Sequence, residues 1–308
     1  MTEAPLATEG EQAGSPPERR GAPYLILDLL VFPLVIVAVG VGVFVLFGLI
    51  TTEGKGPRDY LDLIRAGDSN RRWQAAYELS KVIQESRNPE LSDPRLVGGM
   101  VSLFEEAGGD DPRVRRFLAL ALGRLGNAQA VPALLEYLRG VQRGEGTDSQ
   151  THIYAVWALG AIGEDAAIPE LVALTTHEDP GLRKTAVHAL GAFRSEEATA
   201  VLERALGDPV DDVRWNAALA LAHHGHLAAL PVLEQMLDRG ELARSEAVTP
   251  AQAEEILLQA IAGAALLSDA GLAARLTELS NGDPSLKVRA AAHRSLEQQS
   301  LNRHPASP

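Results

Sequence analysis

The feature that most limits how this chain can fold is a phrase that recurs along most of its 308 residues. Its clearest copy, residues 111–135, contains a turn, a helix with an Ala and Leu face, a glycine, and a second helix opened by Pro132. Related copies occupy residues 151–171, 179–202 and 208–233, with looser ones at 283–296 and 68–83. Self-similarity at a period of 20–50 residues indicates a repeat architecture. The sequence therefore predicts a stack of similar helical units.

The first helix of each unit carries a ten-residue signature. In the copy that starts at Val114, the first, fifth, eighth and ninth positions are Val114, Leu118, Ala121 and Leu122, which follow helical spacing and predict one buried stripe. The glycine that closes this copy, Gly123, is predicted to supply a left-handed cap. The aligned copies are 31 to 43 residues apart, with a degenerate copy at 253–262, and begin at Arg71, Val114, Thr151, Leu182, Val213 and Val288.

The pattern Asp-Pro-x-Val-Arg-x-x-Ala-x-x-Ala-Leu-Gly-x-Leu-Gly, followed by Ala-Val-Pro-x-Leu, resembles HEAT repeats. The resemblance is strongest to the short HEAT-like variety of phycobilin lyases, and it covers about residues 57–300. It implies an all-α fold, a right-handed α-solenoid of about six to seven helix pairs. It also implies that the signature helices line the concave surface. The resemblance is specific for fold and unspecific for function.

The two ends of the chain differ from the repeats. Residues 1–23 read as a disordered tail and residues 301–308 as a flexible one. Residues 29–50 carry no charge, and about 20 apolar residues span a bilayer, so residues 24–52 are predicted to be a single transmembrane anchor. Two basic residues, Arg19 and Arg20, lie before the anchor, and three, Lys55, Arg58 and Arg65, lie after it. Because basic residues are more frequent on the cytoplasmic side, this difference of one charge favours a cytoplasmic solenoid on a bacterial inner membrane.

Composition excludes several kinds of chemistry. The chain has no cysteine, which rules out disulfides and thiolate sites, and a net charge of −13 argues against nucleic-acid binding. No phosphate loop or nucleophile motif is present. His223, His224 and His226 lack acids at ligand spacing, and Glu254 with Glu255 reads as a solvated first turn. The sequence therefore predicts no catalytic residue, no metal site and no cofactor.

An arginine recurs at the second signature position, with His152 as the exception. Its bidentate geometry suits carboxylates, so it is predicted to pair with an acid at a turn of its own or the next repeat. The arginines are Arg72, Arg115, Arg183, Arg214 and Arg289, and the acids are Asp111, Asp179, Asp208 and Asp283.

The third and seventh signature positions lie on one helix face and include all three tryptophans of the chain. Aromatic and arginine side chains are common in the energetic centres of interfaces, although large side chains also simply fill the space between repeats. Both interpretations stay open at this stage. The predicted partner-binding stripe comprises Trp73, Tyr77, Arg116, Leu120, Ile153, Trp157, Lys184, His188, Trp215, Leu219 and Arg294.

These features predict a non-enzymatic, membrane-anchored scaffold that binds a protein partner in its concave groove. The alternatives are a HEAT-like enzyme or accessory subunit of the bilin-lyase type, or an auxiliary subunit of a membrane complex. An enzyme of the lyase type would show acid and base groups converging in one pocket, whereas a scaffold would show an extended groove with varied residues.

Overall fold

The computed structural model describes residues 32–51, 55–85, 89–109, 111–142, 148–244 and 248–303, and every regular element in these ranges is a helix. The chain divides into two units, Met1–Lys55 and Gly56–Pro308. In the first unit the structure describes one helix, α2 (Phe32–Thr51). The predicted N-terminal tail, residues 1–23, lies outside the described residues, as do residues 304–308 at the other end.

The predicted membrane anchor is not supported. A span needs roughly 20 apolar residues, and within the predicted segment 29–50 the structure describes side chains for residues 34–43 alone. In the part of the chain that the structure describes, no helix combines the length and the apolarity that crossing a membrane requires. This finding contradicts the predicted location as a single-pass membrane protein, and the cytoplasmic side predicted for the solenoid, which depended on the anchor, is likewise not supported.

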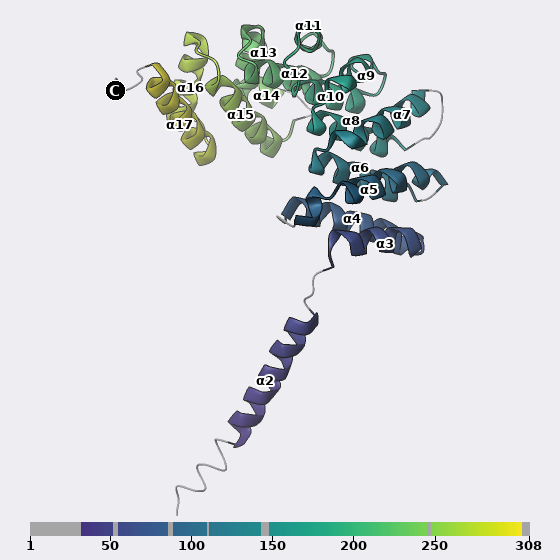
Figure 1. The fold of residues 1–308 in the computed structure, drawn as a ribbon. Helices are drawn as coiled ribbons and strands as arrows, with labels where there is room; N and C mark the ends of the chain where they lie inside the picture. The colour runs from purple at the N-terminus through teal and green to yellow at the C-terminus, as the bar shows by residue number, and fades with distance from the viewer. Residues whose placement is uncertain are drawn as a thin grey trace, which may run out of the picture. The chain divides into compact units, whose positions relative to one another are not determined.

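The second unit is a stack of seven helix pairs within the described residues (Figure 1). This arrangement confirms the predicted all-α, repeat solenoid; its right-handed sense stays a prediction. In chain order the pairs are α3 (Pro57–Ala66) with α4 (Ser69–Glu85), α5 (Pro94–Glu106) with α6 (Pro112–Leu125), α7 (Val131–Gln142) with α8 (Ser149–Ile162), α9 (Ile168–Leu174) with α10 (Pro180–Leu190), α11 (Glu196–Ala205) with α12 (Asp211–His223), α13 (Leu230–Met236) and α14 (Arg239–Arg244) with α15 (Pro250–Ala265), and α16 (Ala270–Gly282) with α17 (Leu286–Arg303).

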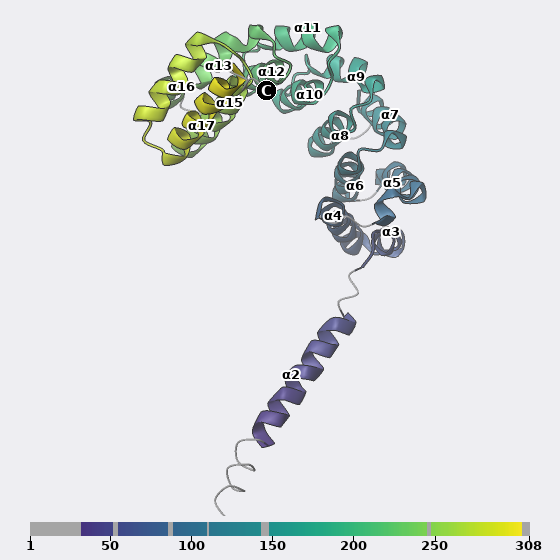
Figure 2. The same ribbon diagram turned by 60° about the vertical axis from the view of Figure 1, so that its left-hand side comes forward.

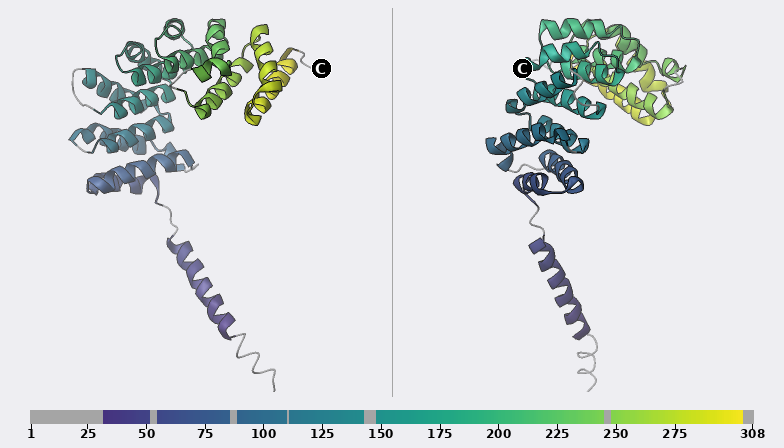
Figure 3. Two further views of the ribbon diagram at one scale, coloured as in Figure 1. Left: turned by 180° about the vertical axis from the view of Figure 1, so that it is seen from behind. Right: turned by 90° about the vertical axis from the view of Figure 1, so that its right-hand side faces the viewer.

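The second helices of the pairs form a continuous inner layer. Helix α4 contacts α6, α6 contacts α8, and the series continues through α10, α12 and α15 to α17. Figure 2 shows these helices on the inner side of the curved stack and the first helices on its outer side. The two layers can be followed from behind and from the side in Figure 3. The signature helices therefore all belong to the inner layer.

Three glycines with positive φ end inner helices and turn the chain. They are Gly126 (φ 63°), Gly163 (φ 75°) and Gly225 (φ 76°), in the left-handed region that glycine tolerates best. Each is followed by a short 3₁₀ turn, at Ala128–Ala130, Asp165–Ala167 and Leu227–Ala229, and then by an outer helix with proline at its second position. The predicted glycine cap exists, but in the copy that starts at Val114 the second glycine of Gly-x-Leu-Gly, Gly126, supplies it instead of Gly123.

The first glycine of that motif has a different role, which corrects the prediction for Gly123. Gly123 and Gly160 are helical and buried, and a Cβ built on Gly160 would lie 2.6 Å from Cβ of Ala189 in α10. A Cβ on Gly123 would lie 2.7 Å from Cα of Ala158 in α8. These glycines let neighbouring inner helices approach more closely than any side chain would permit.

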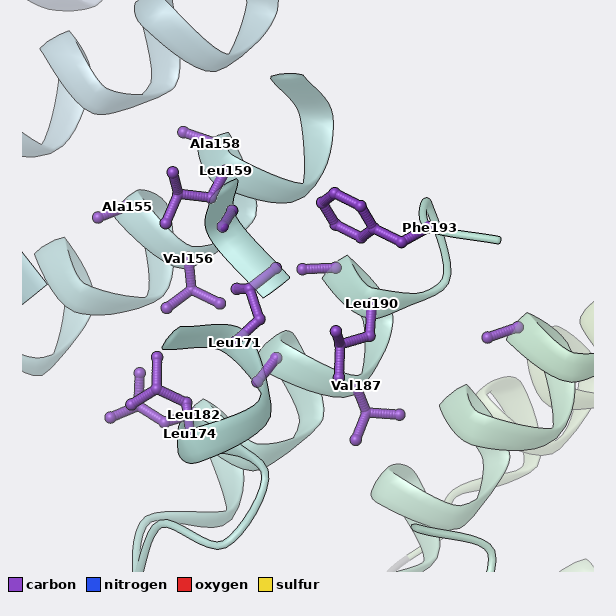
Figure 4. Close-up of a cluster of buried hydrophobic side chains, with 14 of the residues drawn as sticks. Ala155, Val156, Ala158, Leu159, Leu171, Leu174, Leu182, Val187, Leu190 and Phe193 are labelled. Carbon is purple, nitrogen blue, oxygen red and sulfur yellow. The ribbon is translucent and has the colours of Figure 1, made fainter. Parts of the chain in front are cut away.

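The core lies between the inner and outer layers. Val114, Leu118, Ala121 and Leu122 are completely buried, which confirms the predicted stripe. Figure 4 shows one section of this core, where Leu159 of α8, Leu171 of α9 and Leu190 of α10 lie together. All three are completely buried, so each unit contributes side chains to a cluster that continues into the next.

Two arginines of the signature pair with acids, each in a different way. Arg183 reaches the turn of the next repeat, where its Nε and Nη2 atoms lie 2.9 and 3.1 Å from the carboxylate oxygens of Asp208. Arg214 pairs with Asp211 and donates to the carbonyl of Asp208 at 2.8 Å. Arg115 departs from the prediction, because it donates to the carbonyl oxygens of Phe104 and Glu105 instead of to an acid.

Candidate functional site: a tryptophan pocket between the inner helices

A cavity of about 850 Å³ opens between the inner helices α8, α10, α12 and α15, with Leu120 of α6 at one end. We call it the tryptophan pocket. Trp157 of α8 and Trp215 of α12 are partly exposed in its wall, and Ile153 and Ile256 add apolar surface. Ligand pockets typically measure 300–1,000 Å³ and combine apolar walls with a few polar groups. The tryptophan pocket has both properties.

The charged residues that line the pocket are mainly acidic. Asp211, Asp212 and Glu255 contribute carboxylates, whereas Lys184 is its single ammonium group. Lys184 Nζ lies 3.0 Å from Asp212 Oδ2, and Asp211 pairs with Arg214. The exposed imidazole of His188 can accept or donate a proton at the rim. The pocket can therefore hold an aromatic or cationic group, and His188 adds an exposed imidazole to its lining.

A second cavity of about 610 Å³ adjoins the first. Four residues line both cavities: Trp157, His188, Asn216 and Gln259. Its remaining wall consists largely of glycine and alanine from α8, α10, α12 and α15, together with Leu219. The two cavities form adjoining parts of one groove, with the Trp157 and His188 side chains at their junction.

The structure brings together seven of the eleven residues predicted for the partner-binding stripe. Six of them line the tryptophan pocket, and Leu219 lines the adjoining cavity. These contacts place the residues without testing whether they bind a partner. The six are Leu120, Ile153, Trp157, Lys184, His188 and Trp215.

Trp73 and Tyr77 form a separate aromatic cluster with Phe117 of the next inner helix. The ring centroids of Trp73 and Phe117 are 6.4 Å apart, and those of Tyr77 and Phe117 are 5.1 Å apart. The Arg113 guanidinium lies 4.1 Å from the Trp73 ring centroid and pairs with Asp111. At this end of the stripe the aromatic side chains therefore contact Phe117 and Arg113 of the next repeat.

The last two predicted residues lie outside both cavities. Arg116 is mostly buried, and its Nη2 atom lies 3.0 Å from Asp148 Oδ2 at the start of α8, so its guanidinium links two repeats. Arg294 is exposed on α17, the last inner helix. The histidine cluster also separates, since His224 Nε2 contacts the Gly191 carbonyl at 2.9 Å and His226 Nδ1 lies 3.2 Å from Glu203. Among the described residues no group of histidines and acids could hold a metal ion.

Sequence reasoning missed the contribution of α15 to the pocket. Its repeat copy at 253–262 is degenerate, and although Glu255 and Gln259 occupy its third and seventh positions, the predicted stripe left them out. Glu254, in contrast, lies 3.3 Å from Lys287 of α17. Both glutamates of the predicted solvated turn are at least partly exposed, but they face different surroundings. Helical spacing carries the available signal, since Gln252, Glu255 and Gln259 recur at intervals of three and four.

A buried polar cluster lies where α7 meets α8. His152 occupies the second signature position, is 7 % exposed, and its ring centroid is 5.7 Å from that of Tyr137. His152 Nε2 has no hydrogen-bond partner among the described residues. Burial lowers the pKa of His152, although the nearby Asp148 carboxylate acts in the opposite direction. Burial likewise raises the pKa of Tyr137 to about 12. Both side chains are therefore neutral at pH 7.

Because the folded state disfavours the charged form of His152, its contribution to stability should be lost in mild acid. A histidine whose pKa is lower in the folded than in the unfolded state does not affect stability above its ordinary pKa of 6.5, where it is neutral in both states. As the pH decreases from 6.5 toward the folded pKa, the unfolded state binds the proton first, and the free energy of unfolding falls. We expect the free energy of unfolding in urea to decrease from pH 7.5 to pH 5, and His152→Gln to flatten this dependence. His293→Gln, at an exposed position, serves as the control. If the free energy of unfolding falls equally with pH in the wild-type protein and in both variants, His152 is not the source of the pH dependence.

Comparison with known families identifies the repeats. Residues 141–221 match the family described as HEAT repeats, and residues 114–140 and 213–239 match the PBS lyase HEAT-like repeat. The chain contains HEAT repeats. The matched segments run from α6 to the start of α14, so the HEAT repeats supply most of the tryptophan pocket.

Two relatives are similar over larger parts of the HEAT-repeat stack. The phycocyanobilin lyase subunit alpha of Picosynechococcus sp. is 33% identical over 135 residues, which are 41% of this chain and 50% of that protein. This chain therefore matches about half the length of that relative. The solved complex of CpcE and CpcF of phycocyanin lyase from Nostoc sp. aligns with a TM-score of 0.50 and 21% identity, covering 81% of this chain and 96% of that one. At this identity the structural likeness shows the fold alone.

An archaeal HEAT-like repeats protein from Thermococcus onnurineus is a weaker structural match. Its TM-score is 0.41 and its identity 15%, over 81% of this chain and 98% of that one. The relative that is 33% identical is described as a subunit of a lyase. This finding contradicts the prediction that the protein is not an enzyme, which rested on the absence of a recognisable catalytic motif. HEAT repeats carry no such motif in their signature, so its absence was a weak argument.

Proposed function

We propose that this chain is a HEAT-repeat subunit of the bilin-lyase type that binds a protein partner in the groove of its inner helices. The tryptophan pocket carries the proposal, because it combines a ligand-sized volume with two partly exposed tryptophans, on the third and fifth helix pairs. The likeness to a phycocyanobilin lyase subunit supports the reaction class. The solved two-protein complex of the related fold supports a role within an assembly. The binding unit in this proposal is residues 57–300.

The groove residues have distinct proposed roles. Trp157 and Trp215 supply large, rigid contact surfaces, which typically dominate interface energetics. Asp212 holds Lys184 in place at the rim of the pocket. His188, between the two cavities, is the residue positioned to exchange a proton with a bound group.

Reconstitution of the reaction tests this function. The full chain would replace subunit alpha in a mixture of phycocyanobilin, apo-phycocyanin and the remaining subunit of the Picosynechococcus lyase. We expect the chain to bind apo-phycocyanin and to raise covalent pigment attachment above the level without it. Pigment that stays on phycocyanin after denaturation is the measurement. The lyase-type assignment fails if the chain neither binds phycocyanin nor increases attachment.

The two pocket tryptophans should matter more than the third tryptophan of the stripe. We expect Trp157→Ala and Trp215→Ala each to weaken partner binding by about 2 kcal/mol, roughly 30-fold, as expected for tryptophans at the centre of an interface. Trp73→Ala is the matched control, because Trp73 also lies on an inner helix but contacts Phe117 and Arg113. Isothermal titration calorimetry gives the affinities and circular dichroism verifies the fold. Equal losses in all three variants would show that the pocket has no special role.

A further inference from the structure

The tryptophan pocket has more negative charge than its own cations neutralise. Among its lining residues, Asp212 is paired with Lys184, and Asp211 with Arg214. Glu255 is exposed on α15 and accepts a hydrogen bond from Gln259 Nε2 at 3.3 Å. Among the described residues no cation lies within ion-pairing distance of Glu255. The pocket therefore presents one carboxylate that is available to a positively charged ligand.

The chain itself contains an arrangement that shows what such a pocket can hold. At the third signature position of α4, the face of Trp73 is covered by the guanidinium of Arg113, whose charge is balanced by Asp111. Trp215 occupies the same signature position in α12. Within the described residues no cationic group covers the ring of Trp215 or of Trp157. The pocket thus offers tryptophan and carboxylate without the arginine that accompanies them at Trp73.

We infer that the tryptophan pocket receives an arginine side chain of the partner protein, stacked on a pocket tryptophan and paired with Glu255. The inference rests on the proposed function, since it specifies the protein partner of the same groove. A planar guanidinium suits this setting because it stacks on aromatic rings and donates several hydrogen bonds at once. Gln252 and Gln259 of α15 and Asn216 of α12 supply amide oxygens for the remaining donors.

Short peptides provide a direct test. The probe is a fluorescein-labelled Gly/Ser peptide with two arginines, and its matched control carries citrulline, which keeps the planar shape and lacks the charge. Binding to the full chain is followed by fluorescence anisotropy. We expect the arginine peptide to bind roughly tenfold more tightly than the citrulline peptide at low salt, and this difference to shrink at higher salt. Equal binding of the two peptides would overturn the inference.

Adjacent glutamates on α15 provide the matched protein variants. We expect Glu255→Gln to weaken binding of the arginine peptide roughly five- to tenfold and to leave the citrulline peptide unchanged. Glu254→Gln, which disrupts the contact with Lys287 outside the pocket, should change neither peptide by more than about twofold. Similar effects of the two substitutions would contradict the assignment of Glu255.

The outcomes separate this inference from the proposed function. Phycocyanin binding that depends on Trp157 and Trp215 but is unchanged by Glu255→Gln keeps the proposed function and overturns the arginine assignment. Arginine-peptide binding that Glu255→Gln weakens, with no phycocyanin binding at all, supports the arginine assignment and counts against a lyase-type partner.

Discussion

Replacing Gly160 with valine should lower the free energy of unfolding by about 2–3 kcal/mol, the range expected when side-chain atoms are forced into a packed core. A Cβ at this position would lie 2.6 Å from Ala189 Cβ and 2.7 Å from Ala189 Cα. Neither atom belongs to a flexible side chain, so helices α8 and α10 must move apart. This displacement should also disturb the adjoining cavity, which Gly160 and Ala189 line. Urea denaturation followed by circular dichroism measures the loss.

Alanine substitutions separate this clash from the effect of glycine on helix propensity. In an open helical position, replacing glycine with alanine should add up to about 1 kcal/mol of stability. Gly98 in α5 is such a position, because a Cβ there would meet a single neighbouring atom within 4 Å, Gln129 Nε2 at 3.4 Å. We expect Gly98→Ala to stabilise the protein and Gly160→Ala to destabilise it. Stabilisation by both would show that the inner helices tolerate wider spacing.

Replacing Arg239 with methionine should have a similarly large effect, a loss of about 2–4 kcal/mol. Asp283 is 1% exposed at its side chain, and Arg239 Nε and Nη2 lie 2.6 and 2.9 Å from its two carboxylate oxygens. Removing one partner of a buried pair leaves an uncompensated charge, which typically costs 3–5 kcal/mol. We expect a smaller loss than this typical range, because the Arg239 side chain is 26% exposed and water partly screens the pair. Urea denaturation of both proteins at pH 7 provides the measurement.

A surface pair and a double substitution provide the controls for Arg239. Arg275 lies 3.0 Å from Glu278 on the exposed face of α16, so Arg275→Met should change stability by less than about 1 kcal/mol. Adding Asp283→Asn to Arg239→Met removes the buried charge and should recover part of the loss. If Arg239→Met and Arg275→Met are equally mild, the Arg239–Asp283 pair does not hold the sixth and seventh helix pairs together.

The repeating pattern was sufficient to predict helix pairs and their buried face. Val114, Leu118, Ala121 and Leu122 could be assigned to the core because residues three and four apart on a helix share one face. The pairing of Arg183 with an acid of the next turn could also be predicted, since the arginine and the aspartate recur at matching places in successive repeats. The prediction failed where two glycines occur close together, because both the left-handed cap and the close approach of helices require glycine.

The candidate site was only partly predictable, because one of its four helices, α15, carries a degenerate copy of the signature. Trp157, Lys184, His188 and Trp215 share signature positions, so their presence on one surface could be predicted. Arg116 has the same kind of position but turns to Asp148, which caps the start of α8. No pattern in the sequence distinguishes these two outcomes.

The sequence by itself determined the helices, their pairing and the side chains that form the core, since these depend on contacts repeated from one unit to the next. The tertiary structure alone decided that α8, α10, α12 and α15 enclose a pocket, and that Glu255 lines it while Glu254 lies beside Lys287. The physical reason is geometric. The angle between successive repeats follows from how closely their backbones approach, as at Gly123 and Gly160, and small differences accumulate along the stack into a groove of definite shape.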